Sequence, residues 1–211
     1  MRYDLSVIAS WVAPGSRVLD LGCGHGQLLV HLAREKGVKG TGIDRNEDKV
    51  AHGIAEGVRV VHGDMFEEVR DWPDNAFDYA ILSQALMQVM DPAALVREML
   101  RVARFGVVSF PNFAHWRNRL QVLCTGRAPV SPELPYEWFD TPNIRVITLR
   151  DFHRFCRILG YPVLKQCAIR THHHEESGEE VRWLPGLRAT YGIFLLGRTG
   201  EEGETCGRCS G

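Results

Sequence analysis

The residues best suited to ligand binding lie in the stretch VLDLGCGHGQ, residues 18–27, which places three glycines within five positions behind an apolar run. Gly22, Gly24 and Gly26 form a G-x-G-x-G pattern, and Asp20 precedes the first glycine by two residues. Glycines are needed where a ligand must approach the backbone and where φ is positive. A strand, a glycine loop and a helix together direct backbone N–H groups toward a polar ligand group. The stretch therefore predicts a nucleoside-binding loop.

Two later carboxylates are consistent with such a site. The dinucleotide fingerprint needs a third glycine where this chain has Gln27, and the G-x-G-x-G form with Asp20 instead resembles motif I of the class I S-adenosylmethionine-dependent methyltransferases. Asp44 is expected at the end of a second strand, where it can accept hydrogen bonds from both ribose hydroxyls. Asp64 ends a third expected strand, where the resemblance implies an acceptor for the adenine amino group, with Met65 against the ring. A sulfonium ligand also suits carboxylates better than a pyrophosphate does.

The end of the fourth expected strand, which would face the reactive methyl group, offers no evident catalytic group. Ligands of this fold lie beyond the carboxyl ends of the strands, and that end reads LSQALMQV. Ser83 and Gln84 can hydrogen-bond a substrate or the cofactor, but neither is an effective base near neutral pH. The sequence also lacks the Asp/Asn-Pro-Pro-aromatic tetrapeptide and the Pro-Cys nucleophile of two DNA-methylating classes. Cys23 is interpreted as a small packing residue, and the catalytic residues stay unassigned.

Short β-branched runs alternate with helical patterns through the first half of the chain, which is typical of βαβ units and a parallel sheet. Strands are expected at 17–22, 39–44, 58–64, 77–84, 106–112, 161–169 and 189–197, and helices at 26–36, 46–57, 91–106 and 149–159. Asn46 and Asp91 are expected to cap helix starts, and Gly37 to end a helix. The fold class expected is α/β: a three-layer, doubly wound, Rossmann-like methyltransferase sandwich whose seven-stranded sheet is mostly parallel with an antiparallel last strand.

Length and composition indicate one ordinary globular domain over residues 1–200. The chain has 211 residues, 24% of them charged, and a formal net charge of −1, so no general field attracts it to nucleic acid or to an anionic membrane. No apolar run approaches the length of a membrane-spanning helix, and the N-terminus lacks the core of a signal peptide. Six scattered cysteines do not form a secreted disulfide framework, so a cytoplasmic location is expected. The polar, glycine-rich tail 201–211 is predicted to be disordered.

The segment 112–148, termed here the excursion, is rich in Pro, Trp, Arg and Phe and has three open interpretations. Its apolar residues fall on one helical face and its arginines lie off that face: Trp116, Leu120 and Leu123 against Arg117, Arg119 and Arg127. It can be a lid over a carboxylate-bearing substrate, with His115 as proton acceptor. It can be a docking surface, because Trp and Arg dominate binding hot spots. It can also be an amphipathic helix that covers the edge of the sheet, the interpretation that the residues alone favour.

Two histidine and cysteine motifs suggest metal ions, but neither forms a convincing site. In THHHEE, residues 171–176, only His172 and His174 share a face of an extended segment, and two imidazoles do not close a site. Cys206 and Cys209 form C-x-x-C in the tail without a second pair, and are interpreted as free thiols. No metal is therefore expected.

Residues 2–198 as a whole resemble one family, the methionine biosynthesis protein MetW family. Three segments that carry the resemblance are shared with methyltransferase-like folds generally: VLDLGCGHGQLL, GIDRNEDKV and HGDM. Two segments are more specific to the family, SFPNFAHWRNRLQ and PYEWFDTPNI, and they favour a functional role for the excursion. The resemblance implies a methyltransferase fold that works beside homoserine O-acyltransferase (MetX) as its activating or regulating partner. It implies S-adenosylmethionine or S-adenosylhomocysteine as ligand, on Asp20, Gly22, Cys23, Gly24, Gly26, Asp44, Arg45, Asp64, Met65 and Ser83.

Two functional hypotheses follow. In the first, the chain binds the acyltransferase through 112–148 and senses the downstream product of the pathway through the nucleoside site. In the alternative, it is an active methyltransferase on a small carboxylate or phenolic acceptor, with His115 or Tyr136 assisting. Such a transfer needs mainly proximity and alignment, so the missing base does not exclude it. An RNA-binding module, a third class, is favoured by none of the charge features.

Overall fold

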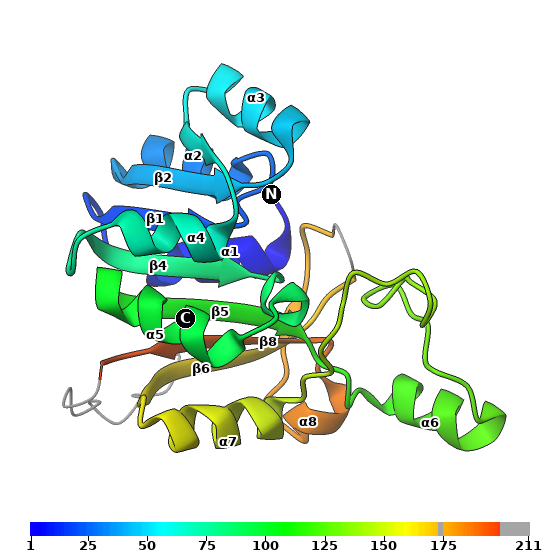
Figure 1. Ribbon diagram of the computed structural model, residues 1–211. Coiled ribbons are helices and arrows are strands. Elements are labelled where there is room, and N and C mark those ends of the chain that lie inside the picture. The colour runs from blue at the N-terminus through cyan, green and yellow to red at the C-terminus, as the bar shows by residue number, and fades with distance from the viewer. Residues whose placement is uncertain (173–174, 199–211) are drawn as a thin grey trace.

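The structure, a computed structural model, describes residues 1–172 and 175–198. A single sheet crosses the molecule, with helices packed against both of its faces (Figure 1). Its strands are β1 (Arg17–Leu21), β2 (Lys39–Asp44), β3 (Arg59–His62), β4 (Phe77–Ser83), β5 (Ala103–Pro111), β6 (Val163–Arg170), β7 (Glu179–Glu180) and β8 (Tyr191–Leu196). Their order is β3-β2-β1-β4-β5-β8-β6-β7.

The direction of the strands agrees with the expected methyltransferase-like sheet. Strands β1 to β5 pair in parallel, and β8 lies antiparallel between β5 and β6. The expectation of seven strands is wrong by one, because β7 adds an eighth that pairs antiparallel with β6. This strand consists of Glu179 and Glu180 alone, and two charged residues carry no alternating apolar pattern from which a strand can be predicted.

The helices are α1 (Tyr3–Trp11), α2 (Gln27–Lys36), α3 (Glu47–Ala55), α4 (Met65–Glu68), α5 (Pro92–Val102), α6 (Trp116–Thr125), α7 (Leu149–Leu159) and α8 (Pro185–Arg188), with 3-10 turns η1 (Val69–Asp71) and η2 (Leu86–Gln88). The expected caps are confirmed. Asn46 accepts a hydrogen bond from Lys49 N at 3.0 Å, and Asp91 accepts one from Ala94 N at 2.9 Å. Gly37 ends α2 with φ +62°. Within residues 1–172 and 175–198, no helix is long and apolar enough to cross a membrane.

Each face of the sheet buries its own apolar cluster. On one face the rings of Phe110, Phe152 and Phe194 pack together with centroids 4.7–5.6 Å apart and bring α7 against β5 and β8. On the other face Ile8 of α1 and Leu32 of α2 are fully buried against the sheet. Helix α1 was not expected from the sequence, since no side chain caps its start and its apolar stretch is short.

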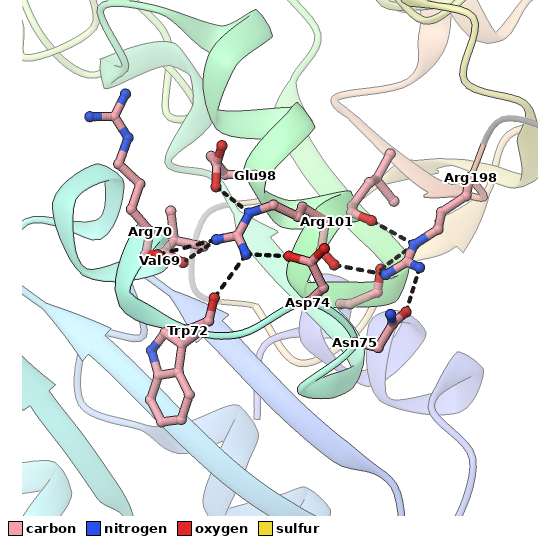
Figure 2. A network of polar contacts seen from close by, with 10 residues as sticks. Val69, Arg70, Trp72, Asp74, Asn75, Glu98, Arg101 and Arg198 are labelled. Atoms are coloured by element: carbon pink, nitrogen blue, oxygen red, sulfur yellow. Dashed lines mark hydrogen bonds and ion pairs between the residues drawn. The ribbon is translucent and has the colours of Figure 1, made fainter.

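The C-terminal end of α5 is held by two arginines (Figure 2). Arg198 donates to the carbonyls of Leu100 (2.6 Å) and Arg101 (2.8 Å), which the helix end leaves without intrahelical donors, and to that of Ala103 (3.0 Å), the first residue of β5. Arg101 in turn donates to the carbonyl of Trp72 at 2.9 Å. The expected helix end near Gly106 is therefore wrong: α5 ends at Val102, and Ala103 already begins β5, opposite Phe77.

The excursion leaves the body of the protein through a narrow neck. Phe113 N donates to the carbonyl of Ile147 at 3.1 Å, so the two ends of the excursion lie side by side. Helix α6 points away from the sheet (Figure 1), and Asn118 is its only buried residue. The interpretation of this helix as a cover for the sheet edge is wrong, because Leu123 on its apolar face is 83% exposed. The tail 201–211 lies outside the described residues.

Candidate functional site

A cavity of about 940 Å³ lies at the carboxyl ends of β1, β2 and β4. The glycine loop after β1 forms one side, and residues 43–46 at the end of β2 and 63–67 after β3 form another. Arg2 and Leu5 at the start of the chain, and residues 83–85 and 88–91 at and after the end of β4, complete the lining. All the predicted binding residues line the cavity except Gly26. The lining members are Asp20, Gly22, Cys23, Gly24, Asp44, Arg45, Asp64, Met65 and Ser83.

The glycine loop is fixed to β2 by its own backbone. Gly22 N and Cys23 N both donate to the carbonyl of Ile43, at 2.8 and 3.0 Å, and the loop turns with φ +75° at Gly22. Gly26 has a different place from the one expected. It caps the start of α2 with φ +75° and packs against Val58, so it shapes the loop without lining the cavity.

Asp44 connects the glycine loop to the next helix. Its Oδ2 accepts a hydrogen bond from Gly24 N at 2.8 Å, and its Oδ1 accepts one from Asn46 N at 2.9 Å. Each carboxylate oxygen has two acceptor positions, so both oxygens retain capacity for a ligand hydroxyl. Arg45 lines the cavity beside it.

Asp20 is the electrostatically unusual residue of the site. Its side chain is buried, and within the described residues its Oδ1 has no hydrogen-bond partner. Burial raises the pKa of Asp20 to about 7; the nearby Asp44 adds to this rise, and Arg2 opposes it. A buried carboxylate oxygen without a partner is costly unless a donor reaches it, and a cation from a ligand is the donor that compensates best. The cavity therefore suits a ligand that carries a positive charge near Asp20.

The side chain of Cys23, in the glycine loop, packs against Gly42 of β2. A Cβ atom placed on Gly42 of β2 would lie 2.5 Å from the Cys23 Sγ, so the thiol occupies the space that the glycine leaves. Burial raises the pKa of Cys23, so the thiol stays protonated at neutral pH. The geometry agrees with a packing role for this side chain.

Asp64 lies where β3 passes into α4. Its Oδ1 caps this short helix by accepting hydrogen bonds from Phe66 N at 2.8 Å and from Glu67 N at 3.4 Å. Met65 follows it on the cavity wall and supplies an apolar surface next to the carboxylate. A strand-end Asp of this kind can cap a helix and accept a ligand donor with its other oxygen.

The carboxylate of Asp4, from α1, lies at the end of β4, where the strand's own residues offer none. Gln84 has φ +57°, and its side-chain amide donates to Asp4 Oδ2 at 2.7 Å. Asp4 is buried, and Arg2 donates to both of its oxygens at 3.1 Å. Ser83 Oγ is hydrogen-bonded to Ser109 Oγ at 3.1 Å. Both polar side chains at the strand end are thus already engaged by protein groups.

Sequence reasoning missed the contribution of the N-terminal segment, where Arg2, the residue before α1, and Leu5 of α1 line the cavity. A signal was present in the first residues, because Asp4 and Ile8 stand one helical turn apart on the buried face. A carboxylate on the buried side of an apolar helix needs a partner, and that requirement indicates a polar site beneath it.

His115 and Tyr136, the residues considered as assisting groups in methyl transfer, lie outside the cavity lining. His115 is buried at the start of α6, and this burial lowers its pKa. Tyr136 lies on the excursion and is 47% exposed. The structure does not bring these two side chains to the end of β4, which removes the basis for a lid with His115 as proton acceptor.

The excursion nevertheless contacts the cavity through a shared segment of backbone, residues 86–91, termed here the wall. Gln88 to Asp91 line the cavity. From the other side, Ile144 N and Arg145 N both donate to the carbonyl of Met87, at 3.0 and 3.1 Å. The Arg145 guanidinium also donates to the carbonyl of Met90.

Among the described residues, no three His, Cys, Asp or Glu side chains are placed to hold a metal ion. His172 instead lies 3.5 Å from Glu133 of the excursion. His174, Cys206 and Cys209 lie outside the described residues.

Comparisons with known proteins give a family and a fold. The model of the family described as "Methionine biosynthesis protein MetW" matches residues 2–196. The bifunctional methionine biosynthesis protein MetXA/MetW of Rhodopirellula baltica is 34% identical over 160 residues, which cover 72% of this chain and 26% of that protein. A demethylmenaquinone methyltransferase of Listeria monocytogenes is 33% identical over 121 residues, half of each chain. This chain thus spans between a quarter and a half of these relatives.

Two solved structures with the same fold are described as S-adenosylmethionine-dependent methyltransferases. The enzyme from Archaeoglobus fulgidus matches with a TM-score of 0.68 at 17% identity, over 92% of this chain and 91% of that one. The enzyme from Thiobacillus denitrificans, solved in complex with S-adenosylhomocysteine, matches with a TM-score of 0.54 at 24% identity, over 77% of this chain and 64% of that one. At these identities the likeness establishes the α/β Rossmann-like methyltransferase fold.

Proposed function

Because this chain belongs to the MetW family of methionine biosynthesis proteins, we propose that it binds S-adenosylmethionine or S-adenosylhomocysteine and acts as the activating or regulating partner of a homoserine O-acyltransferase (MetX). The ligand-binding part of this proposal rests on Asp20, which lines the cavity. Within the described residues, its buried Oδ1 has no hydrogen-bond partner. Both proposed ligands carry an α-ammonium group that would supply the missing cationic donor.

The other residues of the cavity fit the remaining parts of this ligand. Asp44 would accept hydrogen bonds from the ribose hydroxyls, because both of its oxygens retain acceptor capacity. Asp64 and Met65 would hold the adenine, through its amino group and its ring face. Backbone groups of the loop at Gly22 and Gly24 would approach the ligand closely, since no side chain intervenes there.

The end of β4 supports a binding role more strongly than a catalytic one. When bound, S-adenosylmethionine supplies an electrophilic methyl group that an acceptor must approach. Ser83 and Gln84, the polar residues there, are hydrogen-bonded to Ser109 and Asp4. Asp4 is itself paired with Arg2, so both of its oxygens already accept hydrogen bonds from protein groups. The site is therefore best suited to hold the nucleoside and respond to it.

The partnership is supported by the relative from Rhodopirellula baltica, whose name joins MetXA and MetW in one protein. Covalent fusion holds two modules at a high effective concentration. Where the acyltransferase is a separate chain, this protein would need a surface that binds it. A cytoplasmic location, expected from the sequence, is part of the same proposal.

Homoserine acylation by the matching acyltransferase, measured alone and with this protein added, tests the proposal. We expect the acylation rate to rise on addition of the protein, and S-adenosylhomocysteine to change the size of that rise. An unchanged rate, together with no binding of the acyltransferase in solution, would contradict the partnership. Calorimetry that detects no S-adenosylhomocysteine binding would contradict the ligand half independently.

A second candidate function is catalysis of methyl transfer to a small acceptor. The observation that favours it is the likeness to the demethylmenaquinone methyltransferase of Listeria monocytogenes over half of the chain. Transfer to a nucleophile that is already ionised needs alignment more than a base. Incubation with S-adenosylmethionine and a metabolite extract distinguishes the two, because only a catalyst accumulates S-adenosylhomocysteine in step with a methylated product.

A further inference from the structure

Helix α6 exposes apolar side chains without covering any part of the sheet. It has ten residues, of which only Asn118 is buried. Its large apolar side chains are 44–83% exposed: Trp116, Leu120, Val122 and Leu123. These four residues, with Arg117 and Arg119, are termed here the α6 surface. Figure 1 shows the helix extending beyond the body of the molecule.

An isolated helix of this length is marginally stable in water, because most helical stability in proteins comes from packing an apolar face. The ends of α6 are well defined. Gly126 closes it with φ +65°, and the Asn118 amide donates to the carbonyl of Phe113 at 3.1 Å. The chain thus holds a preformed helix in place while leaving its apolar side chains for another molecule to cover. Exposed apolar residues gathered in this way mark an interaction site.

The charge around α6 indicates what kind of molecule covers it. Residues 113–132 contain three arginines and no Asp or Glu, although the whole chain has a net charge of −1. The guanidinium of Arg117 lies over the ring of Trp116, 5.5 Å from its centroid. A surface of Trp, Leu and Arg has the composition of a binding hot spot, and its complement carries apolar groups bordered by carboxylates.

We propose that the α6 surface is the docking site for the homoserine O-acyltransferase, through an apolar patch on that enzyme bordered by Asp and Glu. This inference rests on the proposed function, since that function supplies the partner. A second copy of this chain is a poorer occupant. A symmetric contact would bring the same surface against itself, so Arg117 and Arg119 would face arginines of the other copy without a carboxylate from α6 to neutralise them.

Two substitutions of the same kind, one on α6 and one on α7, test the docking site. Leu123→Glu places a negative charge on α6 at a position that is 83% exposed, and Ile158→Glu makes the same kind of change on α7 at a position that is 71% exposed. Binding of each variant to the purified acyltransferase is measured by calorimetry at two salt concentrations. We expect Leu123→Glu to raise the Kd at least tenfold and Ile158→Glu to leave it within twofold. We also expect added salt to weaken binding of the unmodified chain.

Each outcome separates the docking site from the function on which it rests. If the unmodified chain does not bind the acyltransferase, the partnership itself fails and the docking site with it. If it binds and both Leu123→Glu and Arg117→Glu bind equally well, the partnership stands and the α6 surface is the wrong site. If Leu123→Glu changes only the oligomeric state in light scattering, a second copy covers α6 and the proposal is overturned. Unchanged S-adenosylhomocysteine binding by the variants shows that their fold is intact.

Discussion

Protonation of Asp20 should control how tightly the cavity binds its nucleoside. Burial raises the pKa of this carboxyl to about 7. Its neighbours Arg2, just before α1, and Asp44 on β2 act on this pKa in opposite directions. A ligand ammonium group stabilises the ionised carboxylate, so binding lowers the pKa of Asp20. Lowering the pH through 7 should therefore weaken binding, because the protonated carboxyl must first release its proton.

The size of the effect follows from the pKa. With a value of about 7, roughly a tenth of the carboxyls are ionised at pH 6 and roughly nine tenths at pH 8. The Kd for S-adenosylhomocysteine should thus be about tenfold higher at pH 6 than at pH 8, equivalent to about 1.4 kcal/mol. Close to one proton should be released per ligand bound at pH 6, and few at pH 8.

Isothermal titration calorimetry with S-adenosylhomocysteine measures both quantities, if each pH is repeated in two buffers of different ionisation enthalpy. Asp20→Asn should bind about 10–100-fold more weakly at pH 8, since a charge-assisted hydrogen bond is lost. The Kd of Asp20→Asn for S-adenosylhomocysteine should also no longer show the tenfold change between pH 6 and pH 8. His25 is a histidine that lines the same cavity, so His25→Gln is the control that should retain the change.

The stability of the ligand-free protein provides a second readout of the same carboxyl. A folded-state pKa raised above the ordinary value of 3.8 means that ionisation of Asp20 opposes folding from about pH 4 upward. Asp20→Asn should therefore be more stable than the unmodified protein at pH 8, while it binds the ligand less well. A Kd that is equal at pH 6 and pH 8 in the unmodified protein would refute the reasoning. So would a pH dependence that survives in Asp20→Asn and disappears in His25→Gln.

Three further changes test the surrounding structure. Arg198→Ala should lower the free energy of unfolding by about 3 kcal/mol in urea titrations, because three carbonyls where α5 passes into β5 lose a charged donor. The control Arg97→Ala removes an exposed arginine and should change the free energy of unfolding little; equal effects would contradict this role. Gly42→Ala forces a methyl group against Cys23, so both the melting temperature and the affinity for S-adenosylhomocysteine should fall. An unchanged affinity would show that ligand binding does not depend on the position of the glycine loop. Cys23 should resist iodoacetamide at pH 8 while the exposed Cys124 reacts, as peptide mass mapping can measure; rapid labelling of Cys23 would refute its packed position.

The sequence predicts those parts of the site that one βαβ segment builds by itself. The strand of Asp20, the glycine turn and the end of α2 at Gly37 depend on local patterns, and each lies where its pattern indicated. Asp44 ends β2 as expected, whereas β3 ends at His62, earlier than expected, and Asp64 caps the helix that follows. Their places at the edge of a parallel sheet bring them to one cavity, because the carboxyl ends of such strands share an edge.

Contacts between distant segments account for what the sequence did not predict. The pairing of Asp4 with Gln84 joins residues eighty positions apart, and no local pattern in either segment specifies the other. The early end of α5 depends on Arg198, which follows β8. The contact of Arg145 with the wall likewise depends on how the excursion returns to the body of the protein. In each case a backbone or side-chain group far along the chain provides the partner that decides the local geometry.

The narrow neck of the excursion has a consequence for how this protein can evolve. Phe113 and Ile147 meet through one backbone hydrogen bond, so β5 and α7 stay joined whatever chain lies between them. A different segment inserted at the neck would direct the same nucleoside-binding domain to a different partner while the sheet and the cavity stay unchanged. The contacts of Ile144 and Arg145 with the wall, and of Glu133 with His172, would constrain the replacement. Proteins of this fold that bind other partners should therefore differ mainly at 114–143, whereas members of the MetW family should keep this segment and the donors to the carbonyl of Met87.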